Sequence, residues 1–329
     1  MAKISKNADI YAAGALIWRV NDGTLEVLIV HRPHWSDWSF PKGKVKPGET
    51  LRACCVRELF EEGGVNVVLG RPLGWQRYVV GDGRSKAVRY WSARVINDSD
   101  TVLSARPKAH LARASEVDQR RWVSARRARR MLTSSDDKKM LGKLKKYFDR
   151  GELVTTPVIV LRHAKAIKRE SWKNGAGPEY TRPLAPSGKK RVTQINGDLS
   201  AYGVKEVLSS PWKRCKDTVK DYARITASSL RTQMVLTERG YVVEPQHFSR
   251  EIRNVVETAR DPYVICLHRP TLALTFQTFS EFASHSVLET FPYADPWLKP
   301  GDMFVMHIAS RRGKKSKIVA TEHVTSEFE

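Results

Sequence analysis

The chain opens on two apolar runs that predict a β-hairpin. Residues 10–20 read IYAAGALIWRV and residues 24–32 read TLEVLIVHR, with Asp22-Gly23 between them. Asp-Gly between β-rich runs is typical of the tight turn that joins two antiparallel strands.

The pattern of the next hundred residues predicts a mixed sheet flanked by helices. Residues 43–64 read as a loop, a helix and a second loop, because Gly63-Gly64 is a helix stop. Strands are predicted near residues 65–80 and 87–96. The strand that ends in RRWVS leads into a basic helix over about 125–148.

The pattern of apolar and polar residues changes after Asp149-Arg150-Gly151. PVIVLRHA, from Pro157, is a short and continuously apolar run, which is typical of a buried parallel strand. The strand-like segments KEVLSS, QMVLTE and YVICLH then alternate with helices predicted from about residue 187, from 211, over 245–260 and after 268. This alternation predicts a doubly wound parallel sheet. We therefore expect two domains, residues 1–150 and residues 151–329.

Length and composition agree with a two-domain protein that does not span a membrane. The 329 residues exceed one ordinary domain, and the hydrophobic fraction of 41% can supply two cores. No apolar run reaches eighteen residues, and the first ten residues, MAKISKNADI, contain no apolar secretory segment. The cysteines show no C-x-x-C spacing and are expected to be free thiols: Cys54, Cys55, Cys215 and Cys266. These features predict a cytoplasmic protein.

The formal net charge of +22 favours an anionic substrate or partner. The basic residues gather in three runs: Arg120, Arg121, Arg126, Arg127, Arg129, Arg130; Lys138, Lys139, Lys143, Lys145, Lys146; and Arg311, Arg312, Lys314, Lys315, Lys317. These runs are either solvated faces that steer anions in general or a specific polyanion patch. Nucleic acid is a possible but not favoured partner, because no recognised binding motif accompanies the runs. Self-association is also possible.

The candidate chemistry of the first half lies in residues 43–65, GKVKPGETLRACCVRELFEEGGV. If the middle of this stretch is helical, Glu58, Glu61 and Glu62 share one face. A hard cation would remove the repulsion among them, and clustered oxygen ligands suit Mg²⁺ or Mn²⁺. The alternative is a solvated acidic face.

This stretch resembles the Nudix box at every defining position, which implies a Nudix α/β/α sandwich and a metal-dependent hydrolase of phosphoanhydrides. By the resemblance, Glu58, Glu61 and Glu62 hold the metal ions and help to generate the attacking hydroxide. Gly43 lets the backbone approach closely, and its carbonyl oxygen is a further candidate ligand.

The resemblance also implies roles for the residues around these carboxylates. Arg57 would orient them, with Glu49 reaching back to it. The preceding Phe-Pro-Lys-Gly-Lys segment resembles the loop of Nudix members that act on dinucleoside polyphosphates. Lys42 and Lys44 in this segment are either phosphate-binding point charges or solvated loop residues.

Two tryptophans flank this loop. Trp35 and Trp38 are candidates for stacking on a substrate base, and packing in the core or at its rim is the alternative.

A second candidate site is predicted where strands of the second half end. Arg162-His163 ends the first strand, Arg214 follows the second, and His268 ends a later one. Sites in such sheets lie at the carboxyl ends of strands. Two guanidinium groups can clamp a phosphoryl group, while a neutral imidazole attacks phosphorus. The alternative is that these are ordinary surface or core residues.

These segments resemble the histidine phosphatase superfamily. The resemblance implies that His163 is the phosphate-accepting nucleophile and that Arg162, Arg214 and His268 complete its pocket. The first motif reads Arg-His-Ala instead of Arg-His-Gly, a variant typical of the small branch that resembles bacterial phosphohistidine phosphatases. The family's acidic proton donor has no clear counterpart, and Glu238 in LTERG is the candidate.

A Nudix domain followed by a histidine phosphatase domain resembles the actinobacterial MutT-type sanitising hydrolases. This resemblance implies hydrolysis of 8-oxo-GTP and 8-oxo-dGTP to the diphosphates, and cleavage of diadenosine polyphosphates. Three alternatives stay open. They are hydrolysis of other polyphosphates, such as inositol pyrophosphates or capped RNA; a two-step reaction that uses both domains; and a C-terminal domain that is an inactive docking module.

Overall fold

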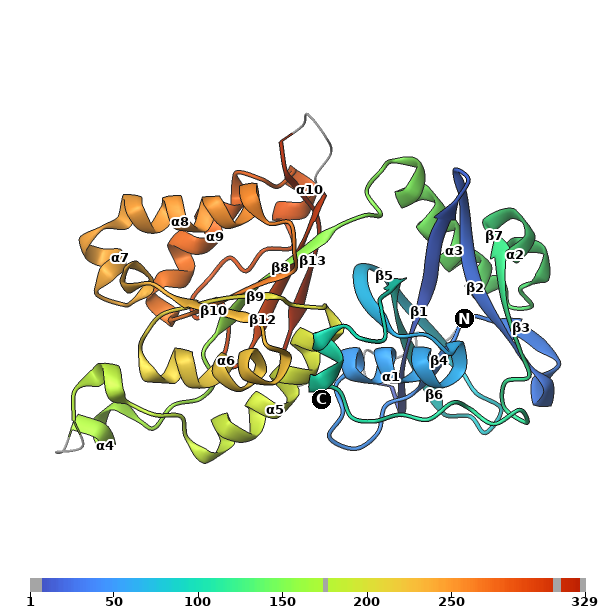
Figure 1. Ribbon diagram of the computed structural model, residues 1–329, viewed down its shortest axis with the longest axis horizontal. Helices are drawn as coiled ribbons and strands as arrows, with labels where there is room; N and C mark the ends of the chain where they lie inside the picture. The colour runs from blue at the N-terminus through green and yellow to red at the C-terminus, as the bar shows by residue number, and fades with distance from the viewer. Residues whose placement is uncertain (1–7, 174–176, 310–314, 326–329) are drawn as a thin grey trace. The chain divides into compact units, whose positions relative to one another are not determined.

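The computed structural model describes residues 8–173, 177–309 and 315–325, and it consists of two compact units (Figure 1). The first unit comprises Met1–Asp100 and Arg106–Val154, and the second comprises Thr101–Ala105 and Thr155–Glu329. Most of the N-terminal segment MAKISKNADI, together with Arg311, Arg312 and Lys314 of the third basic run, lies outside the described residues.

The first unit is built on a seven-stranded mixed sheet in the order β3-β2-β1-β6-β5, with β4 paired to β1 and β7 paired to β2. The strands are β1 Ile10–Asn21, β2 Thr24–Arg32, β3 Asp37–Ser39, β4 Lys42–Lys44, β5 Val67–Val79, β6 Ser85–Val95 and β7 Gln119–Ser124. The predicted hairpin is confirmed, since Asn21 pairs with Thr24 and both Asp22 and Gly23 have positive φ. Strands β1 and β6 are parallel, and the other pairs are antiparallel.

Helix α1, Leu51–Gly63, is the helix predicted within the carboxylate-rich stretch. The Thr50 hydroxyl accepts a hydrogen bond from the Ala53 amide at its start, which satisfies one free N–H group. Gly64 ends the helix with a φ of 72°, a left-handed conformation that glycine adopts without strain. The sequence prediction of this helix and of its end is confirmed.

The single helix predicted over residues 125–148 is wrong, because the chain forms two helices there: α2, Ala125–Met131, and α3, Ser135–Asp149. Polar side chains in the junction compete for backbone hydrogen bonds. The Thr133 hydroxyl accepts from the Trp38 amide, and the Ser134 hydroxyl caps α3 by accepting from the Asp136 amide. Helix periodicity alone does not reveal this break.

The second unit contains a six-stranded sheet in the order β10-β9-β11-β8-β12-β13. Its strands are β8 Thr156–Arg162, β9 Glu206–Ser209, β10 Ser229–Thr232, β11 Tyr263–Leu267, β12 Met303–Ala309 and β13 Lys317–Val324. Strands β8 to β11 are mutually parallel, whereas β12 and β13 form an antiparallel hairpin at one side, which was not predicted.

Helices cover both faces of this sheet, with α5 and α6 on one face and α8 and α9 on the other (Figure 1). The helices of the unit are α4 Arg169–Lys173, α5 Pro186–Ala201, α6 Lys213–Thr226, α7 Gly240–Val243, α8 Pro245–Thr258, α9 Leu272–Ser280 and α10 His285–Leu288. The 3-10 segment Thr101–Ala105 packs on α5 and α6. The predicted α/β fold class, with a doubly wound second sheet, is confirmed.

The strand predicted at QMVLTE is wrong, because residues 234–236 form a 3-10 turn and the strand lies earlier, at β10. The Thr237 hydroxyl donates to the Met234 carbonyl oxygen and accepts from the Gly240 amide, which closes the turn. A threonine that bonds its own backbone removes the chain from the sheet. Val235 and Leu236 are still buried in the core, so the apolar pattern is satisfied without a strand.

Strand register brings the candidate residues of the second unit to one edge of the sheet. All five residues of β11 are buried, and Leu267 pairs with Arg162 on β8 while Cys266 pairs with Ser209 on β9. Three parallel strands therefore end side by side.

The structure also describes the lengths of the helices and the state of the cysteines. Across the described parts of the chain, helices fall short of the length and apolarity that a bilayer crossing needs. All four cysteines are free, and each is buried.

Candidate active site

Helix α1 packs its carboxylates against strand β4 of the first unit. Glu58 is only 8% exposed, and its carboxylate lies so close to Gly43 that a methyl group there would overlap it. A residue without a side chain is therefore required at position 43. The Gly43 carbonyl oxygen lies 3.6 Å from the Cys54 thiol.

Arg57 donates hydrogen bonds to three carboxylates of the cluster. Its Nε and Nη2 donate to the two carboxylate oxygens of Glu49 at 2.7 and 2.8 Å, a bidentate arrangement. Its Nη1 donates to Glu58 Oε1 at 2.6 Å and to Glu61 Oε2 at 2.8 Å. The structure thus brings Arg57, Glu49, Glu58 and Glu61 together, as the sequence suggested.

Glu62 lies on the same helix but has a different partner. Its Oε2 accepts a hydrogen bond from the Lys42 amide at 2.8 Å. Burial raises the pKa of Glu62 to about 7 and also raises the pKa of Glu58 above its ordinary value. Buried carboxylates of this kind are costly unless a cation lies beside them.

The donor set fits a hard divalent cation. Carboxylate oxygens and a backbone carbonyl oxygen are the ligands that Mg²⁺ prefers, and Gly43 leaves room for close approach. Within the ranges described, no group of three or more His, Cys, Asp or Glu side chains is already arranged to hold a metal ion. Arg57 and the Lys42 amide hold the carboxylates instead. The metal ligands Glu58, Glu61, Glu62 and Gly43 therefore stay a prediction.

Three lysines gather on the strands beside α1. Lys42 and Lys44 lie on β4, and Lys86 lies on β6, where it pairs with Tyr78. Burial lowers the pKa of Lys42. The pKa of Lys86 is lowered to about 8, mainly by burial and then by the positive charges of Lys42 and Lys44. An anion among the three would relieve this repulsion. Sequence reasoning missed Lys86, because only the pairing of β6 and β4 with β1 brings it near the loop.

The two candidate tryptophans have different surroundings. Trp35, in the 3-10 turn Pro33–Trp35, is 68% exposed and contacts the His34 ring edge-on. Trp38 packs against the core, and the Arg121 guanidinium lies 5.1 Å from its ring centroid. Stacking on a substrate base stays a prediction for both.

The second unit brings its four candidate residues to the sheet edge described above, and the two imidazoles lie in contact. The ring centroids of His163 and His268 are 5.4 Å apart. His163 Nδ1 lies 2.8 Å from the Ala164 carbonyl oxygen, which assigns the proton to Nδ1. His163 Nε2 then accepts from Arg214 Nε at 3.2 Å. The nitrogen that would attack phosphorus thus carries its lone pair.

Burial lowers the pKa of His163 to about 3 and the pKa of His268 well below its ordinary value, and nearby arginines add to both shifts. Both imidazoles are therefore neutral at physiological pH. Ser210 Oγ lies 2.8 Å from His268 Nε2. A neutral imidazole is the form that acts as a nucleophile.

Arg162 and Arg214 both lie near His163, and the charge of each contributes to lowering its pKa. Arg214 is fully buried, and its Nη2 donates to Glu238 Oε1 at 2.6 Å. Arg162 Nη1 donates to the Leu298 carbonyl oxygen at 2.7 Å, while its buried Nε has no hydrogen-bond partner among the residues described. A buried guanidinium donor without an acceptor fits a pocket that receives an oxyanion.

Glu238 is held at the pocket by three cationic or polar neighbours. Besides Arg214, it accepts from Arg169 Nη2 at 3.1 Å, and its Oε1 lies 3.5 Å from His268 Nδ1. Its role as proton donor stays a prediction.

Sequence reasoning missed Glu179 and Arg182, which form an ion pair at 2.9 Å. Glu179 also lies 3.4 Å from Arg214 Nη1. Both lie in or beside a short 3-10 turn, Glu179–Thr181, that carries no strand-end signal.

The sequence matches known proteins over both units. Residues 10–144 match the family model described as the NUDIX domain. The 8-oxo-(d)GTP phosphatase of Mycolicibacterium smegmatis is 30% identical over 266 residues, which cover 78% of this chain and 76% of that protein. The chain belongs to the Nudix hydrolase family. It is therefore an enzyme that hydrolyses acid anhydrides in phosphorus-containing compounds.

Two further proteins are similar to parts of this Nudix hydrolase. The asymmetrical bis(5'-nucleosyl)-tetraphosphatase of Caenorhabditis elegans is 32% identical over 101 residues, which cover 29% of this chain and 72% of that protein. The solved structure of the protein histidine phosphatase SixA with tungstate is 16% identical and aligns with a TM-score of 0.38. It covers 53% of this chain and all of that one.

We expect the His163 imidazole of this Nudix hydrolase to stay neutral in the folded protein from about pH 7 to about pH 4, because its pKa is about 3. An unfolded histidine has a pKa of about 6.5, so the unfolded chain binds a proton that the folded protein does not. The group therefore costs stability as the pH falls from about 6.5 towards about 3. Nitrogen-15 NMR titration of labelled histidine measures this. Protonation of His163 near pH 6.5 would contradict the burial argument.

Proposed function

We propose that this enzyme hydrolyses phosphoanhydride bonds in nucleoside polyphosphates, with 8-oxo-GTP and 8-oxo-dGTP, converted to the diphosphates, as the principal substrates. Diadenosine polyphosphates are further substrates. The observation that carries the proposal is the likeness to the M. smegmatis 8-oxo-(d)GTP phosphatase, which extends through both units. The C. elegans tetraphosphatase supports the dinucleoside polyphosphates. Inositol pyrophosphates and capped RNA are the alternative substrates.

The carboxylates of α1 act by holding Mg²⁺ or Mn²⁺. Glu58, Glu61 and Glu62 are the ligands, and the Gly43 carbonyl oxygen is a fourth. The cation supplies charge neutralisation for the polyphosphate and acidifies the attacking water. Arg57 keeps the carboxylates oriented through its hydrogen bonds to Glu58 and Glu61.

The lysines of the first unit bind the polyphosphate chain. Lys42, Lys44 and Lys86 have no carboxylate partner at ion-pair distance among the described residues. Their positive charges offset the charge on the phosphate oxygens, and the chain is thereby aligned for attack by water.

We propose a second activity for the site of the second unit. The observation that carries it is the buried Arg162 Nε, which has no hydrogen-bond acceptor among the described residues, near a neutral His163. His163 Nε2 attacks a phosphoryl group, so that an N–P bond forms and the bond to the leaving oxygen breaks. Arg162, Arg214 and His268 bind the transferring oxygens, and Glu238 protonates the leaving group. Water then hydrolyses the phosphohistidine.

Glu62→Gln is expected to lower polyphosphate hydrolysis about a thousandfold, because it removes the charge of one metal ligand and preserves the shape of the side chain. The measurement is a screen of 8-oxo-dGTP, dGTP, diadenosine tetraphosphate and capped RNA with Mg²⁺, with the products identified by chromatography. Glu116→Gln, in an exposed loop of the same unit, is the matched control. Undiminished hydrolysis in excess EDTA would refute the metal assignment.

Lys86→Met is expected to raise KM for the polyphosphate about tenfold, with kcat little changed, because it removes one point charge from the phosphate path and keeps the length of the side chain. Lys86→Arg should retain most of the affinity. Steady-state kinetics at constant ionic strength measures both constants. An unchanged KM in Lys86→Met would exclude this lysine from the substrate site.

His163→Ala is expected to abolish phosphomonoesterase activity and to leave Nudix cleavage intact, because the two reactions use different units. The measurement is transfer of radiolabelled phosphate to the protein, with the label lost in acid and kept in base, as a phosphoramidate requires. Equal labelling of wild type and variant would refute the nucleophile. Absence of label from both proteins, with Nudix activity present, would favour the inactive docking module.

A further inference from the structure

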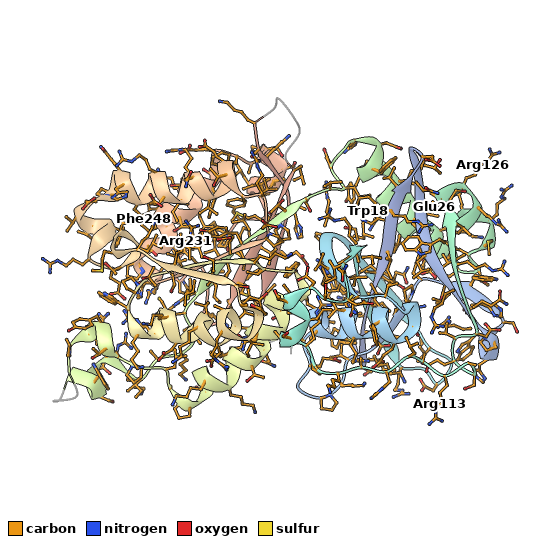
Figure 2. All side chains as sticks on the ribbon, viewed as in Figure 1. Trp18, Glu26, Arg113, Arg126, Arg231 and Phe248 are labelled. Atoms are coloured by element: carbon orange, nitrogen blue, oxygen red, sulfur yellow. The ribbon has the colours of Figure 1, made fainter. Side chains whose placement is uncertain are left out.

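The short helix α2 exposes four arginines on one surface. Ala128 is buried against the core, while the flanking Arg126, Arg127, Arg129 and Arg130 are all exposed. Figure 2 shows Arg126 extending from α2 at the outer edge of the first unit. Spacings of three and four residues place these guanidinium groups beside one another, and like charges at such spacings destabilise a helix.

Nearby carboxylates do not compensate these charges. Over the ranges that the structure describes, none of the four arginines takes part in an ion pair. From Gln119 to Ser134 the sequence holds no Asp or Glu. The charge of this surface is therefore left to solvent or to an external anion.

The helix dipole accounts for the positions of only two of the four arginines on α2. Arg129 and Arg130 lie in the last turn of α2, where cations interact favourably with the negative end of the helix. Arg126 and Arg127 lie in the first turn, which contains no acidic residue, so they face the positive end. Their position costs helix stability and thus needs another explanation.

Strand β3 brings Trp38 to the end of α2, and the exposed Trp35 lies in the turn just before that strand. Backbone and side-chain atoms of Thr133, just after α2, hydrogen-bond to the Trp38 backbone, which ties β3 to the end of the helix. The Arg121 guanidinium lies over the Trp38 ring, and Trp35 of the preceding turn is exposed. A surface that binds single-stranded nucleic acid combines two parts. Cationic side chains contact the phosphate backbone, and aromatic rings beside them stack on the bases.

We propose that the α2 surface, formed by Arg121, Arg126, Arg127, Arg129, Arg130, Trp35 and Trp38, binds single-stranded nucleic acid. The guanidinium groups contact successive phosphates, and an unpaired base stacks on the exposed Trp35. Trp38, which packs on the core, holds the Arg121 guanidinium in place. A single nucleotide carries too few phosphates to engage all the arginines, so the ligand is a polymer. This binding is separate from nucleotide hydrolysis and does not depend on the proposed substrate.

The test measures fluorescence anisotropy of the full chain with labelled oligo(U) RNA and oligo(dT) DNA of about 20 nucleotides over a salt series. The test variant is Arg126→Gln/Arg127→Gln/Arg129→Gln/Arg130→Gln. The control, Lys138→Gln/Lys139→Gln/Lys145→Gln/Lys146→Gln, removes the same charge from α3 of the same unit. Circular dichroism establishes that both variants are folded, and hydrolysis of the small nucleotide by both should match wild type.

We expect the α2 variant to lose at least tenfold in affinity and the α3 variant less than threefold. Because each phosphate contact on a single strand contributes about 0.7 to the salt slope, the slope should fall by about 3 in the α2 variant only. Equal losses in the two variants would mean that net charge alone attracts the strand, and would overturn the proposal.

Two further comparisons keep the proposal falsifiable if the fourfold variant does not fold. Trp35→Ala should weaken binding of oligo(U) but not of polyglutamate, because only bases stack. A duplex of the same length should bind more weakly than the single strand. Equal binding of single strand and duplex, or of polyglutamate and oligo(U), would overturn it, the latter in favour of an acidic protein partner. The RNA and DNA arms identify which strand is preferred.

Discussion

The hydrogen bonds of the Arg57 guanidinium are the interaction on which the first site depends. One side chain holds the loop carboxylate Glu49 with two donors and the helix carboxylates Glu58 and Glu61 with a third. Without that cation, partly buried negative charges would repel one another at the surface of the sheet. Arg57 Nη2 also donates to the Lys44 carbonyl oxygen at 3.2 Å, and the Lys42 amide donates to Glu62, so that β4 is tied to α1. The carboxylate face is thus organised by hydrogen bonds within the protein.

The two units solve opposite electrostatic problems. In the first, buried carboxylates have raised pKa values and require positive charge. In the second, buried imidazoles have lowered pKa values among arginines, and the pocket requires negative charge.

Local sequence signals were enough for the elements that carry the motifs. The Gly63-Gly64 stop predicted α1 and its end. The apolar runs predicted β8 and β11 together with the strand ends that bear His163 and His268. Lys86 and Glu179 could not be found this way, because strand register and a loop path bring them to their sites. The false strand at residues 233–238 and the undivided helix at 125–148 have a common cause. In both, a threonine hydroxyl hydrogen-bonds to backbone: Thr237 to the Met234 carbonyl oxygen within its own turn, and Thr133 to the Trp38 amide of a strand distant in the sequence. Periodicity records neither contact.

The turn at residues 234–240, which replaces the wrongly predicted strand, sets Glu238 apart from the sheet that carries the two histidines. Glu238 lies between Thr237 and Gly240, in a turn that is held by its own hydrogen bonds and not by pairing with the sheet. Gly240 packs so tightly on the Met234 carbonyl that any side chain there would displace the turn. A substitution of Glu238 itself therefore changes the charge beside Arg214 without touching the ladder of β8 and β11, the strands that end at the two histidines.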